Sequence, residues 1–123
     1  MKRTCLLWML FAILMLLVGA CSSDEQYLVH MGETNFVQSS ITIKKGGSVT
    51  LIDDVATTHI IENGMWDPQT GTERPKIEPS APTVDVQIAG SGSQRTIGPF
   101  NTAGTFHLYC TVHPGMNLTV IVQ

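Results

Sequence analysis

Short stretches of alternating apolar and polar residues, separated by turns, fill most of the chain after residue 25. The alternation is clearest at 84–88, where Val84, Val86 and Ile88 fall on one side. Similar β-rich stretches occur at 26–31, 41–53, 57–61, 94–100, 105–110 and 117–122. Because strand side chains alternate with a period of two, these stretches predict strands, and none has the spacing of an amphipathic helix. Seven or eight short strands favour an all-β fold, a Greek-key β-sandwich.

Turn residues divide these stretches. Gly46 and Gly47 separate two alternating runs within 41–53, which predicts a β-hairpin. Residues 62–83 contain two glycines and four prolines, which predicts one long loop. Met65 and Trp66 fall in this loop, and we expect them to pack beneath it, with a docking surface as the alternative.

The first 26 residues differ from the rest of the chain. Residues 1–20 have a cationic start and an apolar middle, as a secretory signal peptide does. The end of this segment, LVGAC, resembles a bacterial lipobox, which implies cleavage before Cys21 and lipid attachment to its sulfur. The chain is then predicted to comprise a signal peptide at 1–20, a lipidated Cys and tether at 21–26 and a domain at 27–123. An uncleaved apolar anchor helix is the alternative.

The predicted tether is short. The five residues SSDEQ reach at most about 17 Å when extended. We therefore expect the domain to lie close to a membrane in the cell envelope. A lipid anchor would place it on the outer face of the cytoplasmic membrane or on the periplasmic side.

Charge and cysteine content narrow the function. Without Lys2 and Arg3, the chain keeps 5 basic residues against 10 acidic ones, a formal charge of −5. This balance argues against nucleic acid as a partner. With Cys5 in the signal peptide and Cys21 lipidated, Cys110 is the one remaining thiol, so no disulfide can form within the domain. A bound metal would protect such a thiol outside the cytoplasm.

The segment CTVHPGM places three metal-binding side chains close together, namely Cys110, His113 and Met116. Cys110 shares the inward face of its predicted strand with Phe106 and Leu108. The following turn, with its Pro and Gly, returns His113 and Met116 to the same end of the sandwich. Thiolate, imidazole and thioether suit copper, whereas zinc gains little from Met.

A blue-copper site needs a second imidazole. Of the three other histidines, His59 stands at the start of a predicted strand after a polar turn, which is the position that the site requires. His30 and His107 are expected to face solvent on their strands.

Two segments of the chain resemble the cupredoxins, the plastocyanin- and amicyanin-like type 1 blue copper proteins. They are ITIKKGGSVTLIDDVATTHII and GPFNTAGTFHLYCTVHPGM. The resemblance covers about residues 35–122 and implies a cupredoxin-like fold with one copper ion. It makes His59, Cys110 and His113 the strong ligands, both histidines binding through Nδ1, and Met116 the weak axial ligand. It also gives Tyr109 and His113 an electron-transfer role, although Tyr109 equally fits cross-strand packing. Ile60 departs from the family, which usually has Asn after the first His to tie the ligand loops together.

The function expected from this resemblance is one-electron transfer between Cu(I) and Cu(II), with redox proteins at or near the membrane as partners. The alternative is a copper scavenger or metallochaperone with the same ligands. No enzyme activity is expected, because multicopper enzymes need more histidines than His30 and His107 supply, and no acid is placed to orient a Cys–His pair.

Overall fold

The structure is a computed structural model that describes residues 25–123, so the predicted signal peptide and Cys21 lie outside it. Within this range the chain forms nine strands: β1 (Tyr27–Met31), β2 (Ser40–Ile43), β3 (Gly47–Asp53), β4 (His59–Trp66), β5 (Glu73–Pro75), β6 (Asp85–Ile88), β7 (Gln94–Phe100), β8 (Gly104–Cys110) and β9 (Asn117–Val122). Across residues 25–123, no helix is long and apolar enough to cross a membrane.

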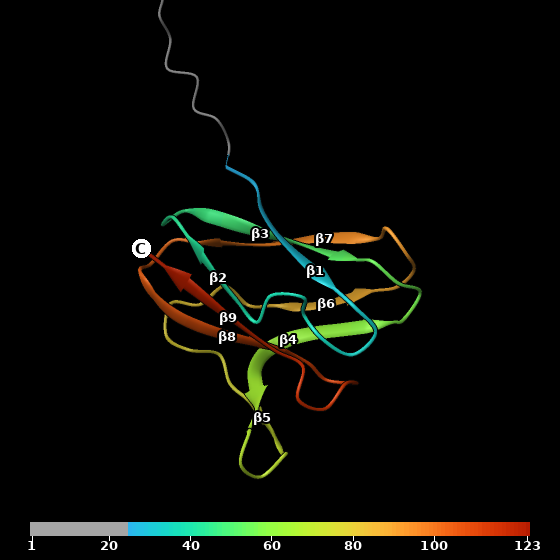
Figure 1. The fold of residues 1–123 in the computed structure, drawn as a ribbon. Coiled ribbons are helices and arrows are strands. Elements are labelled where there is room, and N and C mark those ends of the chain that lie inside the picture. Colours follow the sequence, from blue (N-terminus) through green and yellow to red (C-terminus); the bar gives the residue numbers. More distant parts are fainter. Residues whose placement is uncertain (1–24) are drawn as a thin grey trace, which may run out of the picture.

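The strands form two sheets that face each other (Figure 1). The smaller sheet has the order β1-β3-β7, with β1 parallel and β7 antiparallel to β3. The larger sheet has the order β2-β9-β8-β4-β5, and β6 pairs with the first half of β4. The prediction of an all-β sandwich is confirmed, with nine strands in place of seven or eight.

The inward faces of both sheets form one apolar core. Val49 and Leu51 of β3 and Leu108 of β8 are completely buried, as their alternation predicts. The same core includes Val29, Met31, Ile43, Ile61, Ile88, Phe100, Phe106, Leu118 and Val120. Cys110 continues the inward row of β8 and belongs to this core, so the end of β8 is held firmly.

The hairpin predicted around Gly46 and Gly47 is wrong. The strand before the glycines, β2, pairs in parallel with β9 in the larger sheet, whereas β3 pairs with β1 and β7 in the smaller one. The chain therefore crosses between sheets at Gly46, whose φ of 88° and N–H bond to the Phe100 carbonyl (2.7 Å) define the corner. A sheet crossing and a hairpin place the same residue types at the turn, which explains the error.

The long loop predicted at 62–83 is wrong over part of its length. β4 continues to Trp66, and its last three residues pair antiparallel with β5. Pro75 ends β5, a three-residue exposed strand, where a missing N–H is tolerated. Gly64 lies within β4 with a φ of 130°, and a Cβ there would collide with the carbonyl oxygen of Arg74. The density of Pro and Gly thus reflects a tight hairpin.

The chain enters the sandwich at the end opposite to Cys110. The Tyr27 hydroxyl donates to Glu25 (3.0 Å) and accepts the Lys44 backbone N–H (3.0 Å). Lys44 also pairs with Glu25 through its ammonium group (2.8 Å). The Lys45 N–H donates to the carbonyl of Gln123 (3.0 Å), the residue after Val122, and Val122 pairs with Gly104 at the start of β8. Cys110 lies at the other end of β8.

Candidate metal centre

Two neighbouring strands bring the predicted ligands together. β4 begins at His59, and Ile61 of β4 pairs with Cys110, the last residue of β8. The Thr111 N–H then donates to the Ile60 carbonyl (2.9 Å). This backbone bond joins the two segments that carry the ligands, and it needs no Asn side chain at position 60.

The loop after Cys110 is closed by its own backbone. The Cys110 N–H donates to the Met116 carbonyl (3.0 Å), and the Met116 N–H donates to the His113 carbonyl (3.1 Å). Gly115, with a φ of 80°, makes the reversal, and nothing lies close to it that a side chain would meet. Met116 is 2% exposed, so the chain returns to the core immediately after the turn.

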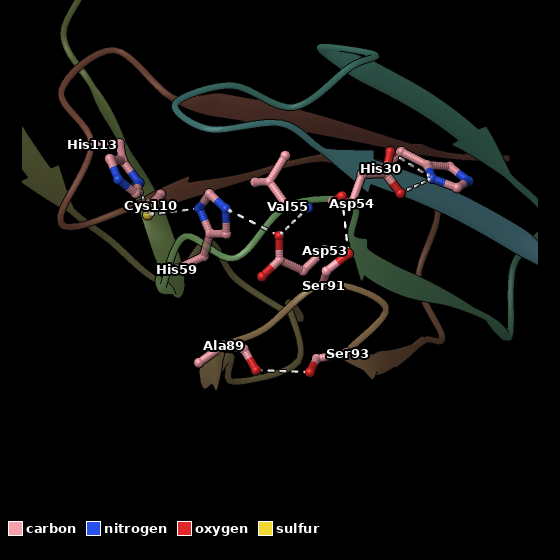
Figure 2. A network of polar contacts seen from close by, with 10 residues as sticks. All are labelled: His30, Asp53, Asp54, Val55, His59, Ala89, Ser91, Ser93, Cys110 and His113. Atoms are coloured by element: carbon pink, nitrogen blue, oxygen red, sulfur yellow. Dashed lines mark hydrogen bonds and ion pairs between the residues drawn. The ribbon is translucent and has the colours of Figure 1, made fainter.

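The side chains of His59, Cys110 and His113 converge (Figure 2), with one potential ligand atom of each within 4.8 Å of the others. The Cys110 Sγ lies 3.8 Å from His59 Nδ1 and 3.3 Å from His113 Nδ1. The two imidazole rings are 4.9 Å apart and tilted by 58°. The structure therefore places three predicted ligands at one point, with both Nδ1 atoms turned to the sulfur.

The three side chains differ in exposure. His59 and Cys110 are completely buried, whereas His113 is only half-buried. Burial is the main influence on the pKa of His59 and lowers it, with the nearby Asp53 acting in the opposite direction. A lowered pKa favours the neutral imidazole, which is the form that binds metals.

This donor set fits copper. Two imidazoles and one thiol converge, and a buried thioether residue follows three positions after His113. That is the donor pattern of a type 1 copper site. Hard cations such as Ca²⁺ and Mg²⁺ prefer oxygen ligands, and no carboxylate belongs to this cluster in the described part of the chain.

Tyr109 lies on the opposite face of β8 from Cys110 and is 1% exposed. Its ring meets Trp66 edge-on, with centroids 6.0 Å apart. Trp66 also donates its indole N–H to the Cys110 carbonyl (2.8 Å). These contacts support the packing interpretation for both aromatic residues, and the bond to Cys110 is one that the sequence did not predict.

The other two histidines form ion pairs away from this centre. His30 Nδ1 lies 2.8 Å from the exposed Asp54 carboxylate, as a solvent-facing residue can. His107 Nδ1 lies 2.7 Å from Glu78, and both side chains are partly covered. The prediction that His107 simply faces solvent is therefore wrong, because Glu78 of the segment before β6 folds over β8.

Sequence reasoning also missed Asp53, the last residue of β3. Its side chain is completely buried, and one carboxylate oxygen lies 3.8 Å from His59 Nε2. The alternation of β3 contained the signal, since Asp53 follows Val49 and Leu51 on the inward face.

Comparisons with known proteins agree with this geometry. Residues 24–123 match the family described as copper binding proteins, plastocyanin/azurin family. Among solved structures, amicyanin from Paracoccus versutus is similar, with a TM-score of 0.60 and 20% identity over 85% of this chain and 87% of that one. The reduced state of an amicyanin mutant gives a TM-score of 0.61 and 20% identity over 85% and 88%. At this identity the solved structures show a shared fold, and a comparison with curated proteins finds no match.

Proposed function

Because the chain belongs to the plastocyanin/azurin family of copper-binding proteins, we propose that it carries single electrons by means of one bound copper ion. His59, Cys110 and His113 are the strong ligands in this proposal, and Met116 is the axial one. The observation that carries it is the convergence of both Nδ1 atoms on the Cys110 sulfur, at 3.8 and 3.3 Å. Copper, when bound, supplies the Cu(I)/Cu(II) couple.

The surrounding protein keeps the ligands in place during electron transfer. Cys110 is fixed by the core and by strand pairing, and the loop to Met116 is closed by backbone hydrogen bonds. Cu(I) and Cu(II) prefer different geometries, so a rigid donor set limits the rearrangement between them. A small rearrangement permits fast transfer.

His113 offers the route to a partner. It is the one half-buried member of the three-residue cluster, and Val112 beside it is 46% exposed. Its imidazole links the buried sulfur region with the surface. A redox protein that docks over His113 would therefore approach the copper ion through one side chain, whereas Tyr109 is 1% exposed and offers a partner almost no surface.

Reconstitution with Cu(II) tests this function. Intense blue colour and a reversible one-electron wave are expected, and His59→Ala should abolish both. The matched control is His30→Ala, which removes a histidine outside the centre and should leave both unchanged. A colourless complex that loses copper to a modest chelator would contradict electron transfer and favour the scavenger or metallochaperone function.

A lipid anchor at Cys21 is a second part of the proposal. It is supported by the LVGAC segment and by a linker of five residues before the domain. The protein would then act at the outer face of the cytoplasmic membrane or on the periplasmic side, with membrane-bound or membrane-adjacent redox partners. Cys21→Ser should release the protein from membrane fractions and prevent labelling with radioactive fatty acid, whereas Cys5→Ser should change neither. Unaltered labelling of Cys21→Ser would rule out the anchor.

A further inference from the structure

A buried carboxyl group lies directly behind the first histidine ligand. Asp53 ends β3, His59 begins β4, and neither side chain has any exposed surface. Figure 2 shows the two in line, with the His59 ring between the Asp53 carboxylate and the Cys110 sulfur. Asp53 Oδ1 is 3.8 Å from His59 Nε2, and Cys110 Sγ is 3.8 Å from His59 Nδ1 on the other side.

The carboxylate is only partly satisfied by its surroundings. Oδ1 accepts the Val55 N–H (3.1 Å), but Asp53 Oδ2 and His59 Nε2 make no hydrogen bond to any residue between 25 and 123. A buried polar group without a hydrogen-bond partner destabilises the folded state, and a charged one does so more strongly. The unpaired Nε2 faces this carboxylate, with Oδ1 3.8 Å away, and the two groups have complementary chemistry. This arrangement indicates a contact that is completed in another state of the protein.

The sequence of β3 makes the position of this carboxyl group unusual. Val49 and Leu51 occupy the same inward face, so an apolar residue would be expected at 53. The next residue, Asp54, shows the ordinary arrangement, because its carboxylate is 45% exposed and pairs with His30. The inward carboxyl group therefore has a specific neighbour, and that neighbour is His59.

Metal binding determines where the proton of His59 must be. When Nδ1 is a ligand, the neutral ring carries its proton on Nε2, which then needs an acceptor. We propose that Asp53 is the positioning residue of this centre: it accepts the Nε2–H of copper-bound His59 and favours the oxidised state. The inference rests on the proposed copper function. The present 3.8 Å is too long for a hydrogen bond, so the ring and the carboxylate must approach by several tenths of an ångström.

The expected effect on the redox equilibrium has a definite sign. A negative group close to the ion stabilises Cu(II), the more highly charged state, and lowers the reduction potential. Asp53→Asn keeps the size of the side chain and removes its charge, so the potential should rise. We expect the Cu(II)/Cu(I) ratio at a fixed ambient potential to fall about tenfold, which is about 59 mV for a one-electron couple.

The matched control is Asp54→Asn. It removes the same formal charge one residue further along the chain, but from an exposed site where solvent screens it. At the same ambient potential, the Cu(II)/Cu(I) ratio of Asp54→Asn should stay within twofold of the wild-type ratio. The proposal is overturned if Asp53→Asn folds, turns blue and behaves like Asp54→Asn. If the wild-type protein itself forms no blue centre, the proposed function has failed, so the two failures can be told apart.

A crystal structure of the copper-loaded wild-type protein tests the contact even if Asp53→Asn does not fold. The expected result is a distance of about 2.7–3.2 Å between His59 Nε2 and an Asp53 carboxylate oxygen. The backbone of Gly32 is the other candidate, since it also acts to raise the pKa of His59. A hydrogen bond from Nε2 to the Gly32 carbonyl, with Asp53 turned away, would overturn the proposal.

Discussion

Met116 ends the loop that closes the metal centre, and its side chain is 2% exposed. A thioether at this position would be a weak axial donor, and such a donor tunes the potential of a type 1 site. Met116→Leu conserves volume, so stability should change by less than about 1.5 kcal/mol. The blue colour should remain, and loss of the donor should raise the potential by about 59 mV, a tenfold change in the ratio of the two states. Voltammetry measures the shift, and an unchanged potential would show that Met116 does not act on the copper ion.

Trp66 fixes the other side of the Cys110 backbone. Its indole N–H donates to the Cys110 carbonyl (2.8 Å), which the His113 N–H reaches only at 3.4 Å. Trp66→Phe keeps an aromatic ring against Tyr109 but removes the donor. The free energy of unfolding should fall by about 1 kcal/mol, the typical net value of one hydrogen bond. Urea denaturation of the metal-free protein measures this loss, and a variant as stable as wild type would show that the bond contributes nothing.

The ligands could be predicted from single residues, but their supporting groups could not. Cys110, His113 and Met116 lie within seven positions, so their spacing alone carries the chemistry, and strand order added His59. Asp53 and Trp66 act on this centre from distant parts of the sequence, and their roles depend on which strands pair. For Asp53, the one local indication of a role at the metal centre was that the alternation of its strand places a carboxyl group on the inward face.

At the scale of elements, the β4–β5 hairpin depends on Asp67 at its turn. The Asp67 carboxylate accepts the N–H groups of Gln69 (2.8 Å) and Thr70 (3.2 Å) and pairs with Arg74. These contacts, the Gln69 bond first, lower the pKa of Asp67 below its ordinary value of 3.8. The contribution of the carboxylate is therefore complete above about pH 4 and is lost as the pH falls through the lowered pKa.

Asp67→Ala should accordingly lower the melting temperature by a few degrees at pH 7. The difference from wild type should shrink below pH 4, where the wild-type carboxylate becomes protonated. Thermal melts from pH 2 to pH 7 measure both curves. Glu33→Ala, which removes an exposed acidic residue that forms no ion pair within residues 25–123, is the control and should shift neither. A difference that stays constant with pH would mean that Asp67 acts without its charge.

The strands were easier to predict than their partners. Alternation located β6 and β8 closely, because their inward residues are apolar and their outward ones polar. Pairing depends on contacts between distant residues, and this is why the turn at Gly46 was taken for a hairpin although β2 pairs with β9. The β4–β5 hairpin was missed because a strand of three exposed residues carries no apolar face.

On the scale of the whole molecule, the chain entry and the metal centre lie at opposite ends of the sandwich. The chain enters beside Tyr27 and Lys44, and the metal centre lies at the far end of β8. Seven residues of strand separate these ends by about 20 Å. An anchor before Glu25 would therefore hold the domain near the bilayer while its His113 end points away from the attachment point.

The metal centre also joins parts of the chain that only the folded state brings together. His59 and Cys110 are 51 positions apart in sequence and meet through the pairing of β4 with β8. The unfolded chain lacks this arrangement, so copper should bind the native state preferentially and stabilise it. With free copper a thousandfold above its dissociation constant, the gain in the free energy of unfolding is about 4.1 kcal/mol.

Urea denaturation with and without copper measures this gain. Wild type should unfold at a clearly higher urea concentration when loaded, and chelation before unfolding should reverse the change. His113→Ala should lose most of the gain because it removes one of the three converging ligands, whereas His107→Ala removes a histidine paired with Glu78 and should keep it. Equal midpoints for the loaded and metal-free wild type, with copper still bound before unfolding, would mean that the unfolded chain holds the ion as tightly. The donors of the segment from Cys110 to Met116 would then suffice for binding without His59, and the folded arrangement would serve to set the redox properties of the ion.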